Sequence, residues 1–164
     1  MGYTHYWTPG RTLTETEWAQ VCKDFQHLFN EAQSYGGGYV ALSSLGDYGK
    51  LPTIGAEAIT FNGVDLGEHG DQSHEPFEIT RARGEWAFCK TANKPYDKVV
   101  VAALIYLATV TESHVPTSDG EHGDWSDGLR LAYRVWPKHR DKLRIPLAAP
   151  VDDDLSDTLH GEDV

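Results

Sequence analysis

The most hydrophobic segment of the chain runs from residue 99 to residue 110. It contains no charged residue, and only one tyrosine and one threonine in it carry polar side-chain atoms. A segment of this length is too short to cross a bilayer, which requires about 20 apolar residues. Pro95 fits the first helical position and Asp97 the first turn, so the pattern predicts a buried central helix. The β-branched run Val99-Val100-Val101 leaves a strand as the alternative.

A second apolar pattern repeats at helical spacing between Glu15 and about Gln33. Thr14 and Glu17 have the spacing of a capping box, which marks the start of a helix. The apolar positions form one stripe, which predicts an amphipathic helix with that stripe in the core: Trp18, Val21, Cys22, Phe25, Leu28, Phe29 and Ala32. Three glycines at 36–38 are expected to end it.

Shorter segments of alternating character predict strands. In the first, Tyr3, His5 and Trp7 would share one face. Asn62-Gly63 is a turn signal of the hairpin kind. The other strand candidates are 39–42, 57–61, 77–80, the segment with Trp86, Phe88 and Cys89, and a short one around Val115, and a last helix is expected from about Ser126 to Trp136.

These elements predict an α+β fold. We expect a mostly antiparallel sheet of about four to six strands, packed against two long helices and one shorter helix. Residues 1–149 would form a single domain. The remaining segment, 150–164, is expected to be an acidic, disordered tail.

The formal net charge of −11 is unevenly distributed. Six acids and no lysine or arginine follow Pro150, which leaves 19 acids against 14 bases, or −5, on the rest. A chain without a general basic face is not expected to bind DNA or RNA directly. The N-terminus has no apolar signal-peptide core, and Cys22 and Cys89 lie in apolar patterns without metal-type spacing. We therefore expect a cytoplasmic protein that does not associate with membranes.

The loop KTANKPYD, between the strand at 86–89 and the central helix, is the leading candidate site. A strand-to-helix turn with cations beside a helix N-terminus can hold an anion. We expect Lys90 and Lys94 to contact phosphate and Thr91 to add a hydrogen bond. The alternative is that both lysines are ordinary exposed loop residues.

Two further sets of polar residues could carry chemistry. The pentapeptide GEHGD occurs at 67–71 and again at 120–124. If the two copies met in space, four side chains could bind a divalent metal: His69, Asp71, His122 and Asp124. Coincidence between ordinary loop residues is the alternative. A Ser/His/Asp triad remains open, because eight histidines are available, but no local motif favours one.

Four segments occur in an order that resembles a known group of proteins. They are MGYTHYW at 1–7, His74-Glu75 followed by Phe77, FCKTA with KPYD at 88–97, and Ser118-Asp119-Gly120. Together they resemble a family of short, uncharacterised proteins encoded by tailed phages and prophages. A cation usually stands in that family where this chain has Asn93, so Lys90 and Lys94 remain the candidate cations. The resemblance implies a phage or bacterial cytoplasmic setting and no established activity.

Our leading hypothesis is a phage-encoded protein that binds or sequesters a small anionic ligand, for which we expect a nucleotide such as a host defence signal. Tyr96 or Trp125 would stack against a base, and His5, His74 and Asp119 would line the rest of the pocket. This requires the lysine-bearing turn to open onto a cavity shared with His74 and Asp119. No cofactor is needed, and homo-oligomerisation is left open.

Two alternatives compete with this binding function. One is a metal-assisted hydrolase or phosphodiesterase that acts on nucleotides through the GEHGD residues. The other is an acidic interaction protein that inhibits a host factor. We favour a non-catalytic binding protein over an enzyme.

Overall fold

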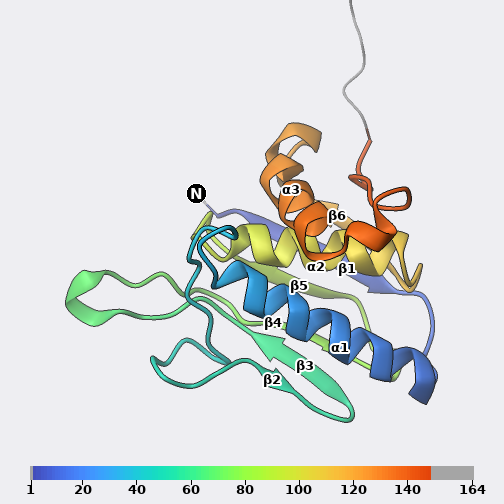
Figure 1. Cartoon of the computed structure of the whole chain (residues 1–164), viewed down its shortest axis with the longest axis horizontal. Helices are drawn as coiled ribbons and strands as arrows, with labels where there is room; N and C mark the ends of the chain where they lie inside the picture. Colours follow the sequence, from blue (N-terminus) through green and yellow to red (C-terminus); the bar gives the residue numbers. More distant parts are fainter. Residues whose placement is uncertain (1, 149–164) are drawn as a thin grey trace, which may run out of the picture.

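The computed structural model describes residues 2–148 (Figure 1). The predicted acidic tail at 150–164 lies outside these residues. Over the described range the chain forms three α-helices and two three-stranded antiparallel sheets. This confirms the predicted α+β class, but the expected single sheet is two small ones.

The first sheet has the strand order β5-β1-β6. Its strands are β1 (Thr4–Pro9), β5 (Ala87–Lys90) and β6 (His114–Ser118). The central strand β1 is antiparallel to both neighbours, and His5 lies opposite Cys89 on one side and Ser118 on the other. His5 and Trp7 point into the core as the alternation predicted, whereas Tyr6 is partly exposed on the outer face.

The second sheet has the order β2-β3-β4 and comprises β2 (Thr53–Ile54), β3 (Ala58–Phe61) and β4 (Phe77–Thr80). Two strand-level predictions are wrong here. Residues 39–42 form no strand, although Val40 and Leu42 are buried, and β2 lies in a segment for which no strand was predicted. Asn62 does not begin a tight hairpin turn, because its backbone pairs with Ser43 and a long loop connects β3 to β4.

Helix α1 (Glu15–Ala32) begins with the predicted capping box, in which the Thr14 hydroxyl accepts from the Glu17 amide and the Glu17 carboxylate accepts from the Thr14 amide. Helix α2 (Asp97–Thr109) confirms the helical interpretation of the apolar segment. It starts two residues after Pro95, because Pro95 and Tyr96 form a turn rather than the first helical residues.

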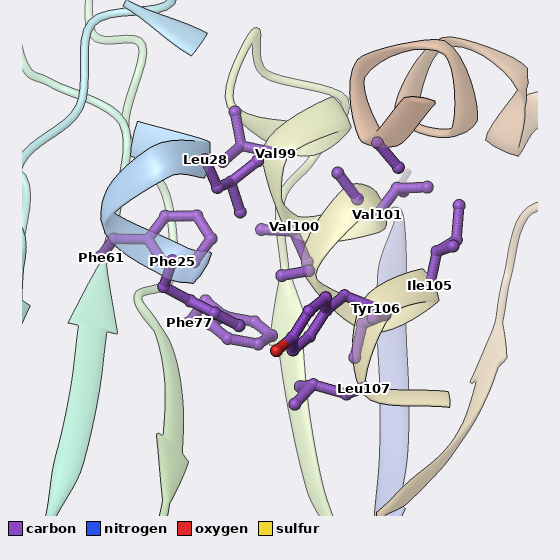
Figure 2. Close-up of a cluster of buried hydrophobic side chains, with 14 of the residues drawn as sticks. Phe25, Leu28, Phe61, Phe77, Val99, Val100, Val101, Ile105, Tyr106 and Leu107 are labelled. Atoms are coloured by element: carbon purple, nitrogen blue, oxygen red, sulfur yellow. The ribbon is translucent and has the colours of Figure 1, made fainter. Parts of the chain in front are cut away.

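Helix α2 lies between α1 and α3 (Ser126–Val135), against the β5-β1-β6 sheet (Figure 1). A helix that is apolar all round must be covered on every side, and α2 is. Figure 2 shows Phe25 of α1 and Phe61 and Phe77 of the second sheet on one side of it, around Val100 and Tyr106. The described helices include none that is both long and apolar enough to cross a membrane.

Candidate functional site

The segments that carry the resemblance meet at one end of the β5-β1-β6 sheet. Because β1 is antiparallel to both neighbours, its first residues lie beside the last residues of β5 and β6, so Thr4 is opposite Lys90. His74 joins the same end, where its Nδ1 lies 2.9 Å from the Lys90 carbonyl oxygen. Asp119 accepts a hydrogen bond from the Thr4 amide at 3.1 Å.

His5 lies at the centre of this end and is fully buried. Its Nε2 lies 2.7 Å from Asp97 Oδ1, and its Nδ1 lies 2.8 Å from Ser118 Oγ. The hydroxyl of Thr91 donates to the same Asp97 oxygen at 2.5 Å. An ionised carboxylate can only accept, so Nε2–H donates to Asp97 and, on a neutral ring, Nδ1 accepts from the Ser118 hydroxyl. This chain of hydrogen bonds, the His5 network, ties α2 to the sheet.

The turn between β5 and α2 is held in an unusual backbone conformation. Ala92 and Asn93 have φ values of 51° and 57°, in the left-handed region that few non-glycine residues adopt. The amides of Thr91 and Ala92 both donate to the Tyr3 carbonyl oxygen at 3.1 Å. These bonds stabilise the conformation and direct the chain into α2.

A cavity of about 380 Å³ lies where α2 and α3 begin, and we call it the α2 cavity. The residues that line it come from the turn and first part of α2, the start of α3 and the segment after α1: Gly38, Val40, Asn93, Lys94, Pro95, Asp97, Lys98, Val101, Asp124, Asp127 and Gly128.

The carboxylates of the α2 cavity already have partners. Asp97 is bound to His5 and Thr91, Asp124 Oδ2 accepts from the Glu121 amide at 2.8 Å, and Asp127 pairs with Arg130 at 2.6 Å. The two lysines of the cavity, in contrast, have few partners. Within residues 2–148 neither Lys94 nor Lys98 forms an ion pair, and Lys94 Nζ donates only to the Asp71 carbonyl oxygen, at 2.9 Å. Lys94 and Lys98 are therefore free of ion pairs within the described residues, and of the three carboxylates only Asp127 has a permanently charged partner.

Of the eight predicted ligand residues, only Lys94 lines the α2 cavity. Four are fully buried, so their side chains have no contact with solvent: His5, Thr91, Tyr96 and Trp125. The Tyr96 hydroxyl donates to the Glu75 carbonyl oxygen at 2.6 Å, and burial, with smaller contributions from neighbouring groups, raises its pKa well above its ordinary value. Neither aromatic ring, that of Tyr96 or that of Trp125, offers a free face to a base.

The other three predicted ligand residues lie near the sheet end but not in the cavity. The Lys90 side chain runs beside Gly2, where a Cβ atom would come within 2.7 Å of its Cε. Asp119 is exposed and also accepts from the Tyr6 hydroxyl at 3.1 Å, and His74 is exposed. The cavity at the lysine turn is thus shared with Asp124 and Asp127, not with His74 and Asp119.

Sequence reasoning missed Lys98 and Asp127, which line the cavity, and the pairing of His5 with Ser118 and Asp97. One signal for Lys98 was available. Lys98 follows Lys94 by only four residues, so the two cations could have been grouped from their proximity in the sequence.

The metal alternative finds no support in the structure. The first GEHGD copy contains the short 3₁₀ segment Gly67–His69, and the second overlaps the 3₁₀ segment His122–Trp125. Among residues 2–148 no group of three or more His, Cys, Asp or Glu side chains is arranged to hold a metal ion. The structure therefore does not assemble His69, Asp71, His122 and Asp124 into a site.

Comparison of the chain with protein-family models, with curated proteins and with solved structures gave no match. Functional inference therefore rests on the geometry described above.

Proposed function

We propose that this protein binds a small phosphate-bearing ligand of the nucleotide class in the α2 cavity. One observation carries the proposal. Lys94 and Lys98 line this cavity without an ion-pair partner in the described range, while each of its carboxylates is already engaged. A phosphate would form ion pairs with both ammonium groups.

The start of two helices at the cavity adds to its affinity for an anion. Asp97 and Lys98 belong to the first turn of α2, and Asp127 and Gly128 belong to the first turn of α3. The N-terminal end of a helix carries a partial positive charge, equivalent to roughly half a unit charge, and favours nearby anions. Both helix starts therefore favour an anion as the lysines do, against the repulsion of Asp97 and Asp127 in the same two turns.

The carboxylates favour a nucleotide over inorganic phosphate. Asp97, Asp124 and Asp127 each use one oxygen in the hydrogen bonds above, and the second oxygen of each has no hydrogen-bond partner among the described residues. A free carboxylate oxygen accepts from a ribose hydroxyl or a base amino group. The cavity volume of about 380 Å³ also falls in the usual range for small-molecule sites.

The biological setting of the proposal comes from the resemblance to phage proteins. A phage protein that binds a nucleotide without converting it can sequester a signalling nucleotide in the host cytoplasm.

Isothermal titration calorimetry with mononucleotides, the matching nucleosides and pyrophosphate tests the proposal. We expect the wild-type chain to bind a nucleotide more tightly than its nucleoside. Lys98→Ala should weaken binding by tenfold or more, because a hydrogen bond to a charged group contributes about 1.5–3 kcal/mol. Lys90→Ala should have little effect, because Lys90 lies outside the cavity.

Lys23→Ala is the matched control, since Lys23 is an exposed lysine of α1 that does not line the cavity. An equal loss of nucleotide affinity in Lys98→Ala and Lys23→Ala would show that binding depends on overall charge rather than on this cavity. That result, or no binding of any phosphate compound by the wild-type chain, would refute the proposal.

A further inference from the structure

A second cavity lies at the opposite end of the His5 network from Asp97. It has a volume of about 490 Å³, and we call it the Ser118 cavity. Its lining comes from the end of β6, the segment before α3 and the last described residues: Thr117, Ser118, Gly120, Glu121, His122, Gly123, Leu147 and Ala148. The α2 cavity shares none of these residues.

We propose that Ser118 is a nucleophile that reacts with small uncharged carboxylic esters in this second cavity, with His5 as its general base and Asp97 as a positioning residue. This activity goes beyond ligand binding in the α2 cavity.

The geometry meets the requirements for an activated serine. A nucleophile and its base must lie within about 2.6–3.2 Å, with a third group orienting the base. Ser118 Oγ is 2.8 Å from His5 Nδ1, and His5 Nε2 is 2.7 Å from Asp97 Oδ1. The carboxylate fixes the proton on Nε2, which leaves Nδ1 as the acceptor that faces the serine. In the usual triad Nε2 faces the serine and Nδ1 faces the aspartate, and here the two nitrogens are exchanged. A triad is nevertheless recognised by its geometry and by the role of each residue.

The Ser118 hydroxyl is oriented from both sides. The Gly120 amide donates to Ser118 Oγ at 2.9 Å, so the hydroxyl proton is directed towards His5. Ser118 is partly exposed and lines the cavity, whereas His5 is fully buried behind it. The nucleophile therefore reaches the cavity and its base is shielded from water.

The walls of the Ser118 cavity indicate the class of substrate. Leu147 and Ala148 offer an apolar surface for a short acyl group, and the described lining includes no lysine or arginine that would bind an anionic substrate. Gly120 allows the Tyr3 hydroxyl to approach, since a Cβ atom there would lie 2.1 Å from Tyr3 Oη. Burial, with the charge of Asp97, raises the pKa of Tyr3 to about 12, and a hydrogen bond with the Ser118 side chain partly offsets this rise. The phenol therefore keeps its proton beside the Ser118 hydroxyl.

The reaction balances without a cofactor. Ser118 Oγ forms a bond to the ester carbonyl carbon as its proton passes to His5 Nδ1. The tetrahedral intermediate breaks its bond to the alkoxy oxygen, which leaves as an alcohol with the proton from His5. Water then attacks the acyl-serine, gives a proton to His5 and releases a carboxylic acid, and Ser118 recovers its proton.

Labelling with a fluorophosphonate ester, followed by intact-mass and peptide mass spectrometry, tests this proposal. We expect one phosphonyl adduct on the wild-type chain, located at Ser118, and none on Ser118→Ala. Ser126→Ala is the matched control and should be labelled as wild type, because the Ser126 hydroxyl donates to the Gly123 carbonyl oxygen and does not line the cavity. Asp97→Asn should slow labelling by about 100-fold or more.

A purely structural network gives a different result. Asp97→Asn would then lower the melting temperature but leave the labelling rate of the folded protein unchanged, whereas a positioning role slows labelling of the folded variant because the imidazole loses the carboxylate that orients it. Absence of an adduct at Ser118 on the folded wild-type chain would overturn the proposal. Ser118→Ala should retain nucleotide binding and Lys98→Ala should retain labelling, so the two proposals fail separately.

Discussion

His114, on β6, is a buried histidine away from both cavities. Its Nδ1 lies 2.7 Å from the Ser113 hydroxyl. Burial, assisted by the charge of Arg11, lowers the pKa of His114 from 6.5 to about 4. The folded state therefore holds this ring neutral over a pH range in which the unfolded chain protonates it.

This shift predicts how stability depends on pH. Neutral His114 lets the folded state keep its full stability above pH 6.5. This stability is lost as the pH falls towards 4, because the unfolded state then binds a proton that the folded state does not. Between pH 7 and pH 4.5, we expect the free energy of unfolding of the wild-type chain to fall by about 2 kcal/mol more than that of His114→Gln. Urea denaturation at the two pH values measures the difference.

His27→Gln serves as the control, since His27 is an exposed residue of α1 and should behave as wild type. A parallel loss of stability in wild type and His114→Gln would show that His114 is already protonated in the folded state at pH 4.5, against this prediction.

At the scale of single residues, the sequence identified Lys94 because a lysine in a short loop before a helix is visible as such. It could not pair His5 with Asp97 and Ser118. These residues are 92 and 113 positions away from His5, and only the strand order brings them together. Burial was equally hidden for Tyr96 and Trp125, whose local sequence is compatible with an exposed ring.

Helices α2 and α3 approach closely at Gly128. A Cβ atom at this position would lie 2.2 Å from Val101 Cγ1. Gly128→Ala should therefore destabilise the protein, even though alanine is favoured over glycine in a helix by up to about 1 kcal/mol. Overpacking of this kind costs about 1–3 kcal/mol, so we expect a net lower melting temperature by calorimetry.

Gly123→Ala is the control, since Gly123 is exposed in the short 3₁₀ segment before α3. A Cβ at Gly123 would meet no atom within 4 Å, so its melting temperature should stay near that of wild type or rise. Equal melting temperatures for Gly128→Ala and Gly123→Ala would contradict the close packing of α2 against α3 at Gly128.

At the scale of elements, local signals succeeded where local chemistry decides the structure. The capping box located the start of α1 to the residue. The Asn62-Gly63 signal failed because tertiary contacts prevailed: the Asn62 side chain accepts from the Gly63 and His74 amides and donates to the His74 carbonyl oxygen. The short strand β2 was not predicted for a similar reason, since its two residues pair only with β3.

At the scale of the whole molecule, the pattern predicted the fold class but not the division into two sheets. Strand β1 pairs with β5 and β6, which follow it by about 80 to 110 residues, and such pairings leave no mark in either segment alone. The same long-range arrangement brings the starts of α2 and α3 together and creates the α2 cavity. The sequence predicted only the wall of this cavity that comes from the turn before α2, and not the wall that comes from α3.

The central claim, that a phosphate-bearing ligand occupies the α2 cavity, is tested most directly by a two-dimensional amide NMR titration of the full chain with a mononucleotide. We expect the largest chemical-shift changes at residues 38–40, 93–98 and 124–128, which surround the cavity. Changes confined to other residues, or none at millimolar nucleotide, would contradict the account.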